Sequence, residues 1–491
     1  MKYISKFFLI SSILLQGVSM ASEIETPTAG YFPPSFPRDP VEVNLFLEHI
    51  LVGQIIEPLV ETGMDGIISP AVASNWEVSK DGLTITFHIR EGLKFSDGNP
   101  VTSEDVKYTL ERHAKSAHSQ SREYLQRIHE MLTPSKEIFV IKLLKPYIAI
   151  FKALSRDQLG IIPKNWKFDK NSNEPFTGSG AYRCIRKDGI WQLKRNEHYR
   201  NYNSVQIDKW KILLGDVKTI TTSGSEIPNI VPFLFKEQLN PLKTRKDYDP
   251  KLRNEEKLVQ FFQSSAWWYP YGKTYQDHKR RQLGLLVASE LINLRIKNGS
   301  LTAATGVIPK GITGYKKDRE SIDLRKELSN VQDRNILIAA FPRDFKTLYN
   351  ESDIKQVSKS LNVKLTVVEE SNVDVTSIQK LKPDVWVFSY AGGFHDPEGF
   401  LTVITSDLGK QLKEVLGNTY NLYESASTEI DWAKRDEKYQ ALNKALIDNF
   451  IMVPGWRYEA FRLRSNTLII QKNNLRYTPK LMDYGFRKEA I

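Results

Sequence analysis

The chain has 491 residues, of which 41% are hydrophobic and 26% are charged. These values are ordinary for a soluble globular protein, and the length exceeds what one hydrophobic core supports, so we expect two or three domains. The formal net charge of +11 comes from basic residues scattered along the chain, which argues against a nucleic-acid partner. Cys184 is the single cysteine, which excludes an intrachain disulfide, and we expect it to be a small buried apolar side chain.

The N-terminus has the pattern of a secretory signal peptide. Lys2 and Lys6 precede an apolar run over 7–15, and the small residues Ser19 and Ala21 stand at the −3 and −1 positions of a cleavage site. Cleavage after Ala21 removes two positive charges and leaves a formal net charge of +9 (+11 minus 2). No cysteine near this point can carry a lipid anchor, so we expect a protein released into the periplasm.

Extended chain and then a helix are predicted before the first clear strand. Residues 23–40 are rich in Pro, Thr and Gly, which favours extended chain. From Leu45 to Val60, apolar residues recur at helical spacing. We therefore expect a helix over 45–60.

The stretch 73–106 predicts a hairpin strand followed by a helix. Asp81-Gly82 supplies the positive-φ position of a tight turn, and residues 83–90 alternate apolar and polar side chains, as in a strand with one wet face. Thr102 resembles the N-cap of a helix with an acidic first turn.

The order of residues in this stretch closely resembles the signature of family 5 extracytoplasmic solute-binding proteins, the peptide, nickel and opine receptors of ABC importers. From Trp76 to Val106 it reads Trp-x-x-x-x-Asp-Gly-x-x-x-x-Phe-x-x-Arg-x-Gly-x-x-Phe-x-Asp-Gly-x-Pro-x-Thr-x-x-Asp-Val. Further segments that resemble the family are 57–60, 176–183, 191–199, 277–287 and 451–455, whereas 219–240 departs from its pattern.

The resemblance implies an α/β fold of the periplasmic-binding-protein type, cluster C (type II), with two α/β lobes joined by a hinge plus an extra subdomain. We assign the chain as follows: signal peptide, 1–21; lobe I, 22–52, 161–258 and 455–491; extra subdomain, 53–160; lobe II, 259–454.

Strand and helix patterns along these segments agree with an α/β fold. Around Gly178 and Gly180 we expect a Gly-rich turn that joins two strands; a phosphate-binding loop is disfavoured because the spacing of a P-loop is missing. Lobe II alternates apolar strands with helical patterns, which predicts a β-α-β-α-β unit with a mostly parallel sheet. The expected strands are 138–143, 336–341, 363–368, 385–390 and 451–455, and the expected helices 277–287, 354–361, 378–381 and 435–447.

The loop after the strand 385–390 is the main candidate for solute binding, because open α/β sheets bind ligands at the carboxyl ends of their strands. Its candidate residues are Tyr390, Gly392, Gly393, Phe394, His395 and Asp396. Asp396 can also cap a helix that begins at Pro397. His395 could ligate a chelated metal, as in nickel-binding members of the family, but a solvated loop histidine is favoured.

One position in this loop departs from the peptide-binding members of the family, in which an aspartate meets the free ammonium of the ligand. Alignment on Asp396-Pro397 puts Gly393 in that place. A buried ammonium without a partner costs several kcal/mol. We therefore expect a neutral, acidic or blocked ligand, unless another acid substitutes.

Aromatic residues after Val259 give a second group of candidates. Trp267, Trp268 and Tyr269, with Tyr271, either stack on a ligand at the lobe junction or pack in a core. Arg281 either pairs with a ligand carboxylate or forms a structural ion pair, of which the second is favoured.

We predict a periplasmic substrate-binding protein of an ABC importer, which captures a peptide, a modified or blocked peptide, an opine or a metal chelate by hinge closure. Its expected partners are this small solute and an inner-membrane permease; we expect a monomer with no cofactor and no resident metal. The alternative is an envelope receptor or chaperone without a transport role. The motifs Gly-x-Ser-x-Gly, His-Glu-x-x-His and Cys-x-x-Cys are absent, which argues against an enzyme, although scattered catalytic residues stay possible.

Overall fold

The computed structural model describes residues 26–32, 39–43, 46–63, 66–167, 176–215, 227–258, 262–268, 277–299, 301–309, 312–315, 328, 330–340, 350–369, 380–391, 396–401, 413–470 and 480–487. The predicted signal peptide lies outside these residues, as do Tyr269, Tyr271 and the first two residues of the predicted helix 378–381.

A seven-stranded mixed sheet forms the core of the first body, with the strand order β12-β19-β11-β1-β10-β9-β8. Its strands are β1 (Thr28–Phe32), β8 (Tyr182–Lys187), β9 (Ile190–Arg195), β10 (Lys209–Leu214), β11 (Ile230–Phe235), β12 (Arg253–Leu258) and β19 (Ala460–Ser465). Cys184 on β8 is fully buried in the core of this body, as predicted.

A six-stranded sheet forms the second body, with the strand order β14-β18-β13-β17-β15-β16. Its strands are β13 (Phe262–Trp268), β14 (Thr302–Ala303), β15 (Asn335–Ala340), β16 (Lys364–Glu369), β17 (Val385–Ala391) and β18 (Met452–Arg457), and its helices are α7 (His278–Lys297), α9 (Glu351–Leu361), η5 (Pro397–Gly399), α13 (Lys413–Leu416), α14 (Asn418–Ser427) and α15 (Trp432–Asp448).

The predicted β-α-β alternation is confirmed for the strands that could be read from the sequence, because β15 pairs in parallel with both β16 and β17. The sheet as a whole is mixed rather than mostly parallel, since β13 and β18 run antiparallel to their neighbours. These two strands carry the chain into and out of the body and are not part of the alternating unit.

The stretch that carries the family signature folds into a four-stranded antiparallel sheet covered by helices. Its elements are β4 (Ala73–Val78), β5 (Thr84–Ile89), β6 (Ile128–Ser135), β7 (Ile138–Leu143), α2 (Ser103–Lys115), α3 (Arg122–Leu125) and α4 (Ile150–Ala153). The predicted alternation is confirmed on β5, where every second side chain is buried. The N-cap is confirmed too, since the Thr102 backbone N–H donates to the Asp105 carboxylate over 2.8 Å.

Shorter elements complete the chain: η1 (Pro40–Glu42), α1 (Phe46–Val52), β2 (Val60–Thr62), β3 (Ile68–Pro70), η2 (Asp157–Leu159), η3 (Tyr202–Ser204), α6 (Lys236–Lys243), η4 (Pro250–Leu252), β20 (Leu468–Ile470), η6 (Leu481–Asp483) and β21 (Tyr484–Phe486). The helix predicted over 45–60 is therefore too long, because α1 ends at Val52. A Cβ atom at Gly53 would lie only 2.5 Å from the carboxylate of Asp157. A segment that is distant in the sequence therefore packs against the C-terminal end of α1.

The Gly-rich turn at 178–180 differs from the prediction as well. It precedes β8, and the turn between β8 and β9 is made by Asp188 and Gly189 at positive φ. A Cβ atom at Gly180 would lie 2.7 Å from the carbonyl oxygen of Gln54. The glycines therefore allow two backbone segments to touch.

Gly178→Ala is expected to lower the free energy of unfolding by about 1–3 kcal/mol. A methyl group at this position would lie 2.2 Å from the carbonyl oxygen of Ile55, and a backbone atom cannot swing aside. Urea denaturation measures the loss. Gly189→Asn is the control: it has open space around it, and asparagine tolerates positive φ better than most residues, so it should cost no more than about 1 kcal/mol and less than Gly178→Ala. Equal effects of the two substitutions would contradict the steric reason.

Buried ion pairs tie the signature-bearing subdomain to the seven-stranded body. Lys480 Nζ lies 2.6 Å from Asp157 Oδ1, with both side chains no more than 6% exposed. Arg200 Nη2 lies 3.1 Å from the carboxylate of Glu57, which is also buried. Because unpairing such charges is costly, the subdomain and the seven-stranded body are held together as one unit.

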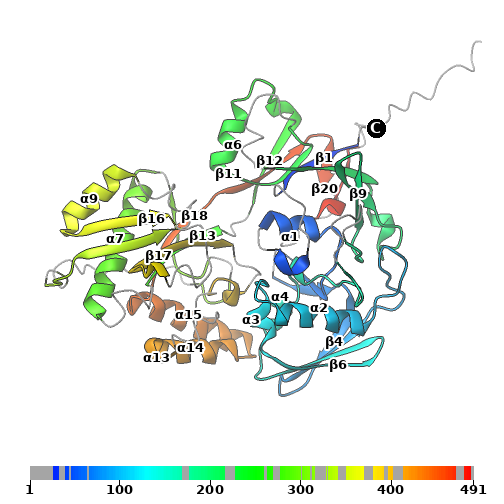
Figure 1. Cartoon of the computed structure of the whole chain (residues 1–491), viewed down its shortest axis with the longest axis horizontal. Coiled ribbons are helices and arrows are strands. Elements are labelled where there is room, and N and C mark those ends of the chain that lie inside the picture. Colours follow the sequence, from blue (N-terminus) through cyan, green and yellow to red (C-terminus); the bar gives the residue numbers. More distant parts are fainter. Residues whose placement is uncertain are drawn as a thin grey trace, which may run out of the picture.

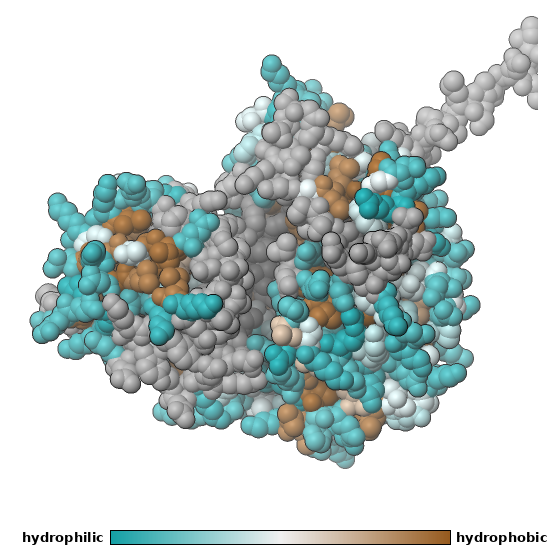
Figure 2. Space-filling model, in the orientation of Figure 1, coloured by the Kyte–Doolittle hydropathy of each residue, from teal (hydrophilic) through white to brown (hydrophobic). Residues whose placement is uncertain are grey.

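The six-stranded body is joined to this unit by two neighbouring strand crossings (Figure 1). The chain passes from β12 to β13 and returns from β18 to β19, and Leu258 and Ala460 are paired on one side of the crossing. Gln263 and Arg457 are paired on the other side. Figure 2 shows a surface that is hollowed between the two bodies. Among the described residues, no helix has the length and apolarity needed to cross a membrane.

Candidate functional site

The candidate site begins at the carboxyl end of β17, in the middle of the six-stranded sheet. Tyr390 lies on β17, where its backbone pairs with Gln263 of β13. Gly392, Gly393, Phe394 and His395 lie outside the described residues. The chain is described again from Asp396, which opens the short helix η5.

Asp396 caps η5, as predicted, with its carboxylate accepting from the Glu398 N–H over 3.1 Å and with Pro397 at the first helical position. The same carboxylate lies 2.9 Å from Arg435 Nη2 of α15, and the two side chains are 2% and 0% exposed. Asp396 therefore fixes the start of η5 against α15 of the six-stranded body.

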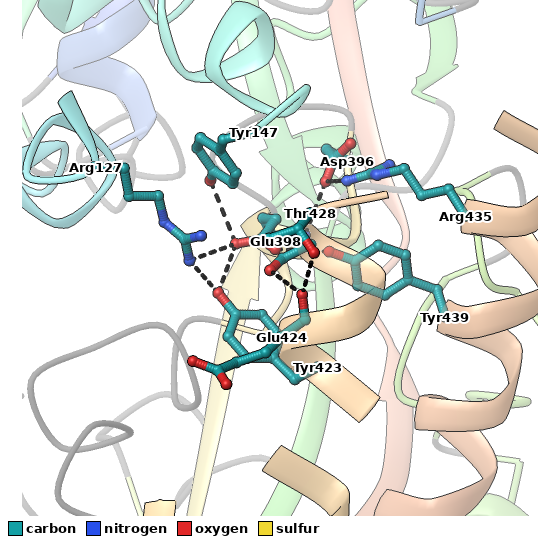
Figure 3. A network of polar contacts seen from close by, with 10 residues as sticks. Arg127, Tyr147, Asp396, Glu398, Tyr423, Glu424, Thr428, Arg435 and Tyr439 are labelled. Atoms are coloured by element: carbon teal, nitrogen blue, oxygen red, sulfur yellow. Dashed lines mark hydrogen bonds and ion pairs between the residues drawn. The ribbon is translucent and has the colours of Figure 1, made fainter. Parts of the chain in front are cut away.

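The structure brings together a group of residues that the sequence did not reveal. Glu398 is fully buried and accepts hydrogen bonds from Tyr439 (2.6 Å), Tyr423 (3.0 Å) and Tyr147 (3.3 Å), while Arg127 Nη2 lies 3.4 Å from its carboxylate (Figure 3). We refer to these five residues as the Glu398 cluster. Arg127 also donates to the Tyr423 hydroxyl and stacks over the ring of Tyr147, with its guanidinium carbon 4.1 Å from the centroid.

The cluster joins the two bodies. Arg127 and Tyr147 belong to the signature-bearing subdomain, next to β6 and β7, whereas Glu398, Tyr423 and Tyr439 belong to the six-stranded body. A neighbouring ion pair makes the same crossing at the surface, since Lys145 Nζ lies 3.9 Å from Glu424.

The three tyrosines of the Glu398 cluster are protonated, as hydrogen-bond donors must be. Burial raises the pKa of Tyr147, Tyr423 and Tyr439 well above the usual value of a phenol, and the nearby negative charge of Glu398 raises it further. Each hydroxyl therefore keeps its proton and donates to the carboxylate.

Two of the predicted aromatic candidates, Trp267 and Trp268, lie in hydrophobic cores. Trp267 and Trp268 are fully buried in the six-stranded body, and Trp267 packs against Trp386 with ring centroids 6.1 Å apart. In this structure both tryptophans pack as core residues, which is one of the two roles that the sequence left open. Arg281 lies over the ring of Trp268 at 4.6 Å, and its Nη2 lies 2.7 Å from His278 Nδ1.

The described residues contain no group of three or more His, Cys, Asp or Glu side chains that could hold a metal ion. The structure shows two bodies that are joined by two adjacent strand crossings and meet at the Glu398 cluster. This arrangement defines a two-lobed α/β protein.

Solved structures with the same fold support this class. Haemophilus influenzae OppA in complex with RPPGFSPFR superposes with a TM-score of 0.73 at 16% sequence identity, covering 95% of this chain and 99% of that one. Brucella suis NikA in complex with Fe(III)-EDTA gives a TM-score of 0.74 at 15% identity, covering 94% and 99%. At these identities the likeness establishes the fold, and the α/β two-lobed prediction is confirmed.

Sequence comparison gives the family. The periplasmic oligopeptide-binding protein OppA of Salmonella typhimurium is 23% identical over 479 residues, which covers 87% of this chain and 86% of the relative. The family model described as bacterial extracellular solute-binding proteins, family 5 Middle, matches residues 68–329, just over half of the chain. The protein belongs to family 5 of the bacterial extracellular solute-binding proteins, the receptors of ABC importers rather than enzymes.

Proposed function

We propose that this receptor captures its solute in the periplasm between the six-stranded body and the rest of the chain, as lobe II and lobe I with its subdomain. The observation that carries this proposal is the pair of adjacent crossings, β12 to β13 and β18 to β19, because two short connections permit a hinge motion. A solute that binds both lobes favours the closed state, and a change from mostly open to mostly closed needs about 5 kcal/mol of differential affinity.

The proposed lobe boundaries follow the sheets closely. The seven-stranded sheet draws on residues within 22–52, 161–258 and 455–491, and the six-stranded sheet on residues within 259–454. The exception is β18, which continues to Arg457 and so extends past the proposed boundary at 454.

We propose a monomer that delivers its solute to an inner-membrane permease, after loss of residues 1–21. The periplasmic relative from Salmonella supports the location. The comparisons lend no support to an envelope receptor or chaperone without a transport role.

The solute class follows from the loop after β17. The relatives bind chemically diverse solutes, since one structure holds RPPGFSPFR and another Fe(III)-EDTA. Within this range, Gly393 stands where peptide-binding members carry the acid that meets a free ammonium. We propose a neutral, acidic or blocked solute, such as a modified peptide, an opine or a metal chelate. We propose that Tyr390, Gly392, Gly393, Phe394 and His395 contact the bound solute. Arg281 is not part of this proposal, because it lies over Trp268, which pairs with Val385 at the opposite end of β17.

Native mass spectrometry of the purified protein is the first test, because a retained solute would be identified by its mass.

Calorimetry with a matched pair of peptides is the second test, with tri-alanine and its N-acetylated form as probes. We expect the acetylated form to bind at least about tenfold more tightly, since a free ammonium would lack a partner. Gly393→Asp is expected to reverse this preference. Micromolar or tighter binding of tri-alanine, with no gain from Gly393→Asp, would contradict the proposal.

A further inference from the structure

We propose that the Glu398 cluster sets the balance between the open and closed states of the unliganded receptor. It does so as a contact that forms only when lobe II meets the signature-bearing subdomain. This inference deepens the proposed function and rests on it, because it assumes that the two bodies move relative to one another.

The position of the cluster favours this role. The crossings at β12–β13 and β18–β19 lie at one end of the boundary between the bodies, and α3 faces α14 and α15 toward the other end (Figure 1). Arg127 lies two residues after the end of α3, and Tyr423 lies on α14. A hinge motion displaces the end far from the crossings most, so Arg127 and Tyr423 would separate early on opening.

Glu398 has partners that divide between the two bodies. Tyr423 and Tyr439 come from its own body and would remain with it in any lobe position. Arg127 and Tyr147 come from the subdomain, and Arg127 is the cation of this group. Opening therefore leaves Glu398 with two phenol donors and the nearby charge of Arg435, and without the guanidinium of Arg127.

The subdomain is not free to follow lobe II. The buried pair Lys480–Asp157 and the pair of Arg200 with the buried Glu57 fix it to the seven-stranded body. Separation of the two bodies thus has to break the Arg127–Glu398 and Tyr147–Glu398 contacts. Hydrogen bonds to charged groups contribute enough to change a two-state ratio roughly tenfold to a hundredfold.

The test measures lobe separation without any ligand. Spin labels are placed at Glu77→Cys on β4 and Lys355→Cys on α9, whose side chains are 80% and 79% exposed. The native Cys184 is buried and stays unlabelled. Pulsed electron paramagnetic resonance then gives the distribution of distances between the labels. Its short and long components report the closed and open populations.

Arg127→Met is expected to lower the ratio of short to long separations roughly tenfold to a hundredfold. Lys142→Met is the matched control, because Lys142 pairs with Glu130 inside the subdomain and faces no residue of lobe II in its described contacts. Tyr147→Phe removes one donor to Glu398 while it keeps the ring under Arg127, and it is expected to shift the ratio in the same direction by a smaller factor.

Two results would overturn the inference. One is an unchanged ratio in Tyr147→Phe together with an unchanged or unfolded Arg127→Met protein. The other is an unsubstituted receptor whose labels already lie wholly at the long separation. Because no solute is present, neither result bears on which ligand the receptor takes, and a failed calorimetry experiment would leave the lobe equilibrium measurable.

Discussion

Arg435→Met is expected to lower the free energy of unfolding by roughly 3–5 kcal/mol. The substitution leaves the carboxylate of Asp396 buried without its countercharge, 2% exposed and next to the apolar core of lobe II. The η5 cap that Asp396 forms through the Glu398 N–H would be strained at the same time. Denaturation in urea, followed by far-UV circular dichroism, measures the change.

Two further variants serve as controls for Arg435→Met. Arg435→Met combined with Asp396→Asn is expected to recover part of the loss, because it removes the unpaired charge. Lys355→Met, which disturbs only an exposed pair with Glu351, is expected to cost less than about 0.5 kcal/mol. A loss below about 1 kcal/mol for Arg435→Met would show that the buried pair is not a source of stability.

Acid is expected to destabilise the receptor through His113, which is fully buried on α2. Burial, together with the neighbouring charge of Arg112, lowers the pKa of His113 to about 3. The unfolded chain therefore takes up this proton first, at its ordinary pKa near 6.5. The stability that neutral His113 contributes is complete above about pH 6.5 and falls as the pH is lowered toward 3, with about 2 kcal/mol lost at pH 5.

His113→Gln measures this contribution. Between pH 7.5 and pH 5, the unfolding free energy of the variant should fall by about 2 kcal/mol less than that of the unsubstituted chain. Carboxylates contribute equally to both proteins and cancel in the difference. His118→Gln replaces an exposed histidine of the same subdomain and serves as the control. Parallel stability curves for the His113 variant and the unsubstituted chain would contradict the assignment.

Local patterns account for the parts of the fold that the sequence predicts well. The alternation on β5 and the N-cap at Thr102 depend on neighbouring residues alone, and both are confirmed. The helix that ends at Val52 could not be read in the same way. Its end is set by Asp157 and Lys480, which reach Gly53 from distant parts of the chain.

In the candidate site, too, local motifs could be predicted and contacts between distant segments could not. The cap formed by Asp396 and Pro397 is a local motif and was predicted. The partners of Glu398 were not, because Arg127 is 271 residues away in the sequence and Tyr147 is 251 residues away. The sequence shows only an acidic residue in the first turn of a capped helix, which does not identify its partners.

The paired crossings have a consequence for how the molecule is put together. Leu258 and Ala460 are neighbours in the seven-stranded sheet, so the polypeptide leaves and re-enters that sheet at almost the same point. Lobe II is therefore an insertion into an otherwise continuous scaffold. A linker of a few residues would close the scaffold without it, and a different module with adjacent termini could be grafted in its place.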